Sequence, residues 1–325
     1  LIGYGIGQAA PLAAFILVGP RMRRLMPNGH SLTEYVWHRY GRSMYVFTLG
    51  IIVFYMFIFL SAELTGISLA FEPVADTSAG ITAAIVGLLT VAYTAYGGIR
   101  ASIFTDSIQF TIILPLLLLA FAVAVVELGG FGSALDPVRA DSPQLLSLTH
   151  GAGIEFGVTL VIAILAANMF HQGFWQRVYT VRDERALRRG FAVAGAIVIP
   201  VIVIAGFLGI LAVGKGLVGE DAPASVALFS LVVEVMPTWA AVGVLLLALV
   251  LVMSSMDTLL NGIASAVTSD LARFKPDLSG SLLLRSSRAV TIVLIVPAIL
   301  IASQGYSVLY LFLIADMVCA AAVFP

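Results

Sequence analysis

Hydroxyl, amide and carboxyl side chains recur at helical spacing within the apolar stretch Leu247–Asp270. Offsets of three and four residues place such side chains on one face of a helix. The face consists of Ser254, Thr258, Asn261, Ser265 and Thr268, with Ser255 and Asp257 beside it. Because hydrocarbon cannot satisfy polar groups, we expect this face to meet other helices or a wet cavity rather than lipid.

The adjacent hydroxyls of Ser254 and Ser255 are suited to a small alkali cation. In transporters, oxygen atoms of this kind coordinate sodium together with carbonyls of an unwound neighbouring helix. A structural alternative remains open, because serine and threonine in membrane helices also hold helices together or bond back to their own backbone. Asp257 favours a functional site, since a carboxylate at the centre of a membrane helix costs about 2.5–3.5 kcal/mol.

The composition predicts a multi-pass membrane protein. Of 325 residues, 60% are hydrophobic and 11% are charged, whereas soluble domains carry about 25% charged residues. The net charge of −1 argues against a nucleic-acid partner, which requires a basic surface. The single cysteine, Cys319, excludes an intrachain disulfide.

Nine apolar stretches are expected to span the lipid bilayer, since a membrane helix needs about 20 residues. They are Gly3–Gly19, Tyr45–Ala70, Gly80–Tyr96, Ser107–Val126, Glu155–Phe174, Phe191–Val213, Ala240–Ser265, Val290–Ala302 and Tyr306–Pro325. The shorter stretch Ser225–Met236 is expected to form a helix on the outer face or beneath a loop. Because the chain starts without Met and ends inside an apolar stretch, we expect it to be a segment of a longer protein.

The basic residues indicate how the chain is oriented. If alternate loops are cytoplasmic, only Arg139 and Lys215 of the 17 Lys and Arg residues lie on the outer side. By the positive-inside rule the first span then runs from outside to inside. The charge run Gln176–Arg189 predicts a solvated surface helix that anchors this topology.

Few other polar side chains lie within the predicted spans. They are Gln8, Glu63, Asn168, His171, Gln172 and Asp316. Asp316 lies in the middle of an apolar run and needs a partner there. Glu63 could instead face water near the outer end of its span, and His171 could be a hydrogen-bonded packing residue.

The loop Tyr96–Gln109 (YGGIRASIFTDSIQ) contains a second candidate carboxylate. Gly97 and Gly98 can end one helix, and Thr105 or Asp106 can begin the next, with Gln109 at capping-box distance from Asp106. Asp106 is therefore either a helix cap or a carboxylate at the cytoplasmic mouth of an ion path.

These motifs resemble the sodium:solute symporter family. The matching stretches are Ala10–Leu12, Leu32–Tyr40, Tyr96–Gln109, Phe170–Arg189 and Met253–Asp270 (MSSMDTLLNGIASAVTSD), which together cover nearly the whole chain. The resemblance implies an all-α, five-plus-five inverted-repeat bundle of the leucine-transporter type that lacks its first core helix. Residues 1–126 would be the remainder of the first repeat and residues 155–325 the second, within one transporter domain.

The resemblance also implies which residues bind the ion and the solute. Ser254, Ser255 and the Leu251 carbonyl would bind Na⁺ as the coupling ion, with no organic cofactor. Gln8, His171, Gln172 and Asp316 are the candidates for the cavity of a small-molecule solute. Asp106, Asp257 and Asn261 are candidates for a cytoplasmic ion path or gate.

We therefore expect sodium-coupled import of a small polar organic solute, by alternating access, across the inner (plasma) membrane. The alternative is a transporter-like membrane sensor. In that case a signalling kinase domain would follow this segment at the C-terminal side of the parent chain. An enzyme is not expected, because the sequence contains no nucleophile elbow and no HExxH metal motif.

Cysteine labelling tests the orientation. In a variant whose native thiol is removed (Cys319→Ala), a cysteine at Asp183 or Asp277 should react with an impermeant maleimide only after permeabilisation. A cysteine at Asp76 or Asp141 should react in intact cells, because basic loops stay on the cytoplasmic side. The reverse labelling pattern would overturn the orientation.

Overall fold

The computed structural model describes residues 1–75, 77–219, 224–275 and 277–323, which consist of helices and their connections. Asp76, one of the labelling positions, and the last two residues of the ninth predicted span lie outside the described residues. The helices are α1 (Ile2–Leu25), α2 (Leu32–Ala75), α3 (Ala79–Glu127), α4 (Phe131–Asp141), η1 (Pro143–Leu146), α5 (Gly151–Asn168), α6 (Gln172–Thr180), α7 (Glu184–Gly214), η2 (Ala224–Val226), α8 (Ala227–Val235), α9 (Thr238–Phe274), α10 (Gly280–Ala302) and α11 (Val308–Val323).

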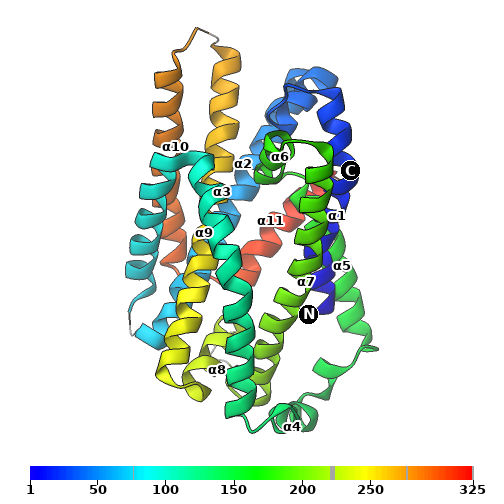
Figure 1. The fold of residues 1–325 in the computed structure, drawn as a ribbon, viewed down its shortest axis with the longest axis vertical. Helices are drawn as coiled ribbons and strands as arrows, with labels where there is room; N and C mark the ends of the chain where they lie inside the picture. The colour runs from blue at the N-terminus through cyan, green and yellow to red at the C-terminus, as the bar shows by residue number, and fades with distance from the viewer. Residues whose placement is uncertain (76, 220–223, 276, 324–325) are drawn as a thin grey trace.

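The predicted helical membrane architecture is confirmed. Eight segments of the described chain are long and apolar enough to cross a bilayer, and each of them overlaps one of the first eight predicted spans. The ninth predicted span contains α11, which is apolar but only 16 residues long. The helices run mainly along one axis, with the α9–α10 turn at one end and α4 across the other (Figure 1). The short apolar stretch after α7 is helical as expected and forms η2 and α8.

Two long helices are interrupted at glycines. Gly98 has φ 56° and ψ −155° and divides α3 into two segments, as the glycine pair predicts. Gly41 has φ 82° and divides α2 in the same way. Only glycine adopts such positive-φ conformations without steric cost. Because the second segment of α3 contains Asp106 within the helix, this carboxylate is not a helix cap.

The fifth predicted span is discontinuous rather than one helix. Helix α5 ends at Asn168 and α6 begins at Gln172. The turn between them has short-range backbone bonds, with the His171 amide donating to the Asn168 carbonyl at 3.1 Å. The Trp175 indole donates to the Met169 carbonyl at 2.8 Å and satisfies a carbonyl that the break releases. Sequence analysis did not predict this interruption, because no glycine or proline lies between Asn168 and Gln172.

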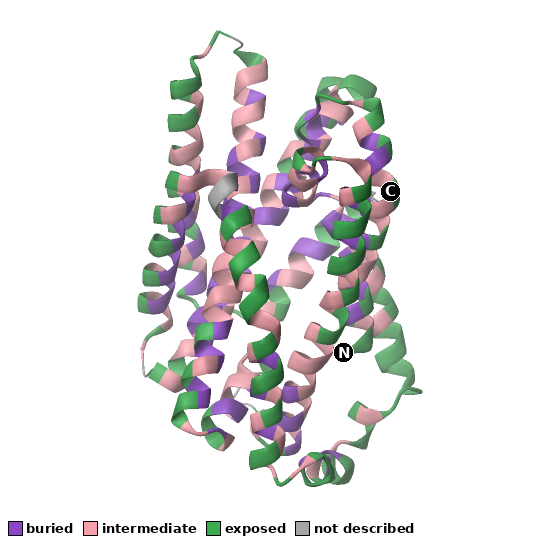
Figure 2. Cartoon of the chain, in the orientation of Figure 1, coloured by how far each residue is buried: buried purple, intermediate pink, exposed green. Residues whose placement is uncertain are grey.

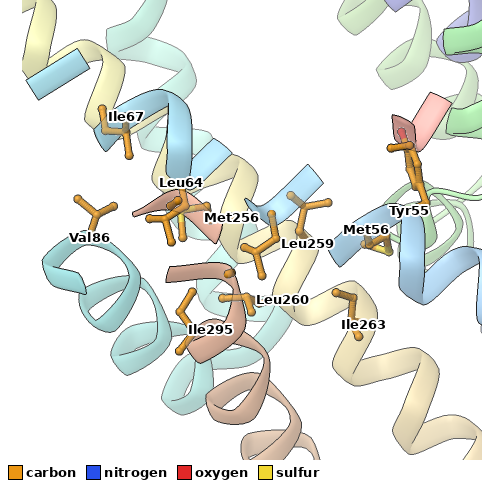
Figure 3. Packing of buried hydrophobic residues seen from close by; sticks show 14 of the residues in the cluster. Tyr55, Met56, Leu64, Ile67, Val86, Met256, Leu259, Leu260, Ile263 and Ile295 are labelled. Carbon is orange, nitrogen blue, oxygen red and sulfur yellow. The ribbon is translucent and has the colours of Figure 1, made fainter. Parts of the chain in front are cut away.

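The largest buried cluster joins α2, α3, α9, α10 and α11 (Figure 3). Leu64 of α2 and Leu260 of α9 are fully buried there, and Ile295 of α10 packs against them. Exposed apolar residues lie on the outer surface of the bundle instead, among the exposed positions of Figure 2. Val126 is 72% exposed and Val293 67% exposed, as expected for side chains that face lipid.

Helices α1 and α5 approach most closely at two glycines. A Cβ atom at Gly3 would overlap the Cα atom of Gly157, and one at Gly7 would lie 3.3 Å from the Cα atom of Val161. Small residues permit this kind of backbone contact between membrane helices. The contact holds α1 against α5 just before the break that begins at Asn168.

Substitution at this contact should loosen the bundle. We expect Gly3→Ala to destabilise the protein by about 1–3 kcal/mol, because the added methyl group meets backbone atoms that cannot rotate away. The measurement is the thermal unfolding midpoint of the purified protein in detergent. Gly50→Ala is the matched control, since a Cβ there meets no atom within 4 Å. Equal midpoints for the two variants would contradict the close contact.

Candidate functional site

A cavity of about 940 Å³ lies between the helices that carry the predicted polar residues. Its walls come from α1, α2, α3, α5, α6, α7 and α9 and from the α5–α6 break. The polar or charged residues on its wall are Gln8, Glu63, Asp106, Ser107, Asn168, His171, Arg177, Thr180, Ser254, Ser255 and Thr258. The cavity therefore gathers polar groups that are far apart in the sequence.

The two serines of α9 lie side by side on the wall of the cavity. Ser255 Oγ donates to the Leu251 carbonyl at 3.3 Å, one turn earlier, and Ser254 Oγ donates to Asp106 Oδ1. Ser255 therefore bonds back to the backbone of its own helix, which is the structural role that we gave above as the alternative to cation binding. A hydroxyl that donates its proton keeps acceptor lone pairs, so both serines retain oxygens that can bind a cation.

Asp106 pairs with an arginine of the predicted surface run. Arg177 Nη2 lies 2.8 Å from Asp106 Oδ2 and donates to Thr258 Oγ1 at 3.2 Å. Its Nη1 atom donates to the Gly173 carbonyl at 3.3 Å. The prediction of one solvated helix for this run is therefore wrong: the chain breaks after Thr180, and Arg177 joins α6 to α3 and α9.

Asp257 is buried and does not line the cavity. Its Oδ1 atom accepts from Ser102 Oγ at 2.7 Å, and its Oδ2 atom accepts from the Tyr93 hydroxyl at 3.1 Å. Tyr93 precedes the break at Gly98 and Ser102 follows it. One carboxyl of α9 therefore binds both segments of α3, and nothing in the sequence pattern indicated Tyr93 as its partner.

The remaining candidates lie in different surroundings. Gln8 and His171 line the cavity, whereas Gln172 is fully buried and donates through Nε2 to the His30 carbonyl at 3.2 Å. Asn261 lies one turn after Thr258, and its main-chain carbonyl accepts from Gln176 Nε2 at 3.4 Å. Asp316 is 4% exposed and lies outside the lining residues, in α11.

Glu63 is the residue whose position the sequence left most uncertain. The structure places it on the cavity wall, opposite Ser255, instead of in water at the outer end of α2. Its position in the interior of a long apolar helix was the signal that could have identified it, because a carboxylate there needs a polar neighbour.

The N-terminal end of α7 is capped by an aspartate. Asp183 Oδ1 accepts from the Ala186 amide at 2.8 Å. This backbone bond, together with the bond from Arg182, holds the pKa of the exposed Asp183 carboxyl below its usual value. The cap begins α7 directly before Ala186 and Leu187, which line the cavity.

Comparison with known proteins gives consistent matches. The model of the sodium:solute symporter family matches residues 4–325. The spermidine transporter DUR31 of Candida albicans is 30% identical over 325 residues, which cover 99% of this chain and 60% of the relative. The urea-proton symporter DUR3 of Oryza sativa subsp. japonica is 21% identical over 359 residues, which cover 99% of this chain and 50% of the relative.

A solved structure shares the fold. A Na⁺-coupled sialic acid symporter in a substrate-bound, outward-open state superposes with a TM-score of 0.75 at 22% identity, over 99% of this chain and 69% of that one. The chain thus spans 60% and 50% of the lengths of the two curated relatives.

Removal of the Asp257 carboxyl should separate α3 from α9. We expect Asp257→Ala to destabilise the protein by about 1–3 kcal/mol, because it leaves the buried Ser102 hydroxyl without its acceptor and leaves Tyr93 bonded only to the Met253 carbonyl of α9. Thermal unfolding in detergent measures this, with the exposed Asp277→Ala as the control. An unchanged midpoint for Asp257→Ala would show that the carboxyl does not hold the helices together.

Proposed function

Because the chain belongs to the sodium:solute symporter family, we propose that it forms most of the solute pathway of a sodium-coupled symporter. The family and these relatives are transporters, as the sequence predicted, and none of them is an enzyme. The proposed protein imports a small polar organic solute by alternating access, as a multi-pass protein of the plasma membrane. The comparisons provide no support for the alternative of a sensor domain.

The observation that carries this proposal is the placement of Ser254 and Ser255 on the cavity wall. We assign their hydroxyls and the Leu251 carbonyl to the sodium ion, as the family resemblance implies. These three oxygens are about half of the shell of a hard cation, which takes about six. Water in the open cavity and further oxygen atoms of the protein would supply the remainder.

Coupling requires that sodium bind the outward-open and inward-open states with different affinity, since equal affinity shifts neither state. Each entering sodium ion gains about 2.3 kcal/mol per 100 mV of membrane potential. The α5–α6 break and the interruption at Gly98 are places where helix segments can change orientation. We propose that Asp106, Asp257 and Asn261 lie along the cytoplasmic path that this movement opens.

The solute would occupy the 940 Å³ cavity. Gln8 and His171 line it, and we propose Gln172 and Asp316 as further residues that act on the solute from behind the wall. The names of the spermidine and urea transporters support a small polar organic solute. The coupling ion is decided by experiment, because one of these relatives is named a urea-proton symporter.

Uptake by the full-length protein tests the coupling ion. A panel of sugars, amino acids, amines and carboxylates is offered in sodium buffer and in choline buffer, each at two values of external pH. We expect uptake of at least one solute to require sodium at both pH values. Uptake that follows pH and ignores sodium would instead identify proton coupling and refute the proposal.

The serine pair makes the test specific. We expect Ser254→Ala and Ser255→Ala each to raise the sodium concentration for half-maximal uptake about tenfold, because loss of one ligand costs about 1.4 kcal/mol. Ser265→Ala is the control, since Ser265 lies on the same helix but does not line the cavity. Unchanged sodium dependence in both serine variants, at normal expression, would refute the site assignment.

A further inference from the structure

The cavity wall carries one carboxylate whose charge is not balanced. Its charged lining residues are Glu63, Asp106 and Arg177. Arg177 pairs with Asp106 at 2.8 Å, so these two charges offset each other. Among the described residues Glu63 has no ion-pair partner, and its neighbour Ser255 is neutral. A carboxylate in a membrane interior needs a positive partner or a proton. A cationic occupant of the cavity, next to the sodium ion proposed at Ser255, would stabilise its charge.

A second carboxyl lies behind the same wall. Asp316 is 4% exposed, and its Oδ1 atom has no hydrogen-bond partner among the described residues. The hydroxyl of Tyr55 is also buried without a partner, and it lies within electrostatic range of Asp316. Tyr4 lies within range of both Asp316 and Glu63, and it hydrogen-bonds Gln8 on the cavity wall. Both tyrosines therefore lie near the buried acid, and Tyr4 reaches the cavity wall at Gln8.

Aromatic rings surround the space next to these acids. Phe59 and Phe174 line the cavity, and His171 stacks on Phe174 with ring centroids 4.7 Å apart. Tyr55, labelled on α2 in Figure 3, lies 4.6 Å from Phe59 and 6.1 Å from His171 between ring centroids. Aromatic faces beside a carboxylate are the surroundings that organic ammonium groups bind, because the ring faces carry negative potential.

The spacing of the two acids restricts the ligand further. Phe59 of α2 pairs with Phe312 of α11 at 4.6 Å, one helical turn from Glu63 on α2 and one turn from Asp316 on α11. The hydroxyl of Tyr55, eight residues before Glu63 on α2, is within electrostatic range of Asp316. Eight residues of helix rise about 12 Å, so Tyr55 and Glu63 are about two turns apart along α2. A solute with two ammonium groups could serve both acids.

We propose that the solute of this transporter is an organic ammonium ion, and that a diamine with a short methylene chain is bound best. Glu63 binds the first ammonium group, Phe59 and Phe174 on the cavity wall contact the methylene chain, and Asp316 attracts the second ammonium group from behind the wall. A neutral or anionic solute would bring no cation to either carboxyl, so Glu63 would depend on the sodium ion proposed at Ser255 or on a proton. This assignment rests on the proposed function only in that it places the solute in the same cavity.

Direct binding measurements separate this assignment from transport. The full-length protein in lipid nanodiscs is titrated with 1,4-diaminobutane, with butylamine and with 1,4-butanediol, each in saturating sodium and in choline. We expect the diamine to bind tightest and the neutral diol about tenfold more weakly or worse, because only the amines neutralise the acids. If the diol binds as well as the diamine, or if none of the three probes binds, the assignment is wrong.

Two substitutions locate the two ammonium groups. We expect Glu63→Gln to weaken the binding of both amines about tenfold or more, and Asp316→Asn to weaken the diamine while leaving butylamine nearly unchanged. Glu72→Gln is the matched control, since Glu72 is exposed on the same helix. Glu63→Asp keeps the charge and should restore part of the affinity, so a folding defect of Glu63→Gln does not decide the outcome.

Two further results distinguish the assignment from the proposed function. If Glu63→Gln shifts sodium affinity and leaves amine preference intact, Glu63 is a sodium ligand and the assignment is overturned. If the preference for the diamine is present but sodium has no effect on binding or uptake, the assignment stands and sodium coupling fails.

Discussion

A carboxylate buried among membrane helices must find its hydrogen-bond donors within the protein, and the arrangement of this bundle depends on how Asp257 finds them. Its two oxygens accept from Ser102 and Tyr93, which lie on opposite sides of the break in α3. The bonds align both segments of α3 with α9. Because Ser254 lies one turn before Asp257, the same alignment brings Asp106 to Ser254 and Arg177.

The interruptions of the helices position the site as much as the helices do. Gly98 lets α3 change direction, and the α5–α6 break brings Asn168 and His171 to the cavity wall. In a lipid bilayer such irregular backbone is tolerated only where the protein or a wet cavity surrounds it. The Trp175 bond to the Met169 carbonyl supplies this protection at the α5–α6 break.

The charges at the cavity divide into a balanced group and an unbalanced one. Asp106 and Arg177 form a pair that joins three helices, whereas Glu63 and Asp316 have no basic partner among the described residues. A pair of opposite charges stabilises an arrangement of helices, but it offers little net charge to a ligand. The unbalanced acids are the groups that our proposal assigns to the ligand, whereas the Asp106–Arg177 pair joins α3, α6 and α9 at the cavity wall.

The membrane class, the positions of the first eight spans and the polar face of α9 followed from the sequence alone. Hydrophobic length and helical spacing are local properties, and a bilayer imposes the same length on each helix. The glycine pair similarly indicated the break in α3, because only glycine adopts the required positive φ without cost. Local patterns also identified Ser254, Ser255 and Asp106 as candidates, since polar residues are conspicuous in apolar surroundings.

The partners of those residues were decided only by the tertiary structure. Ser102 and Tyr93 lie 155 and 164 residues from Asp257 in the chain, and no local pattern relates positions so far apart. The α5–α6 break depends on a tryptophan that captures a carbonyl, and Glu63 faces the cavity because α2 packs against α9 on one side. Whether a buried charge is balanced depends on which helices meet around it, and helix packing determines this through contacts that are distant in sequence.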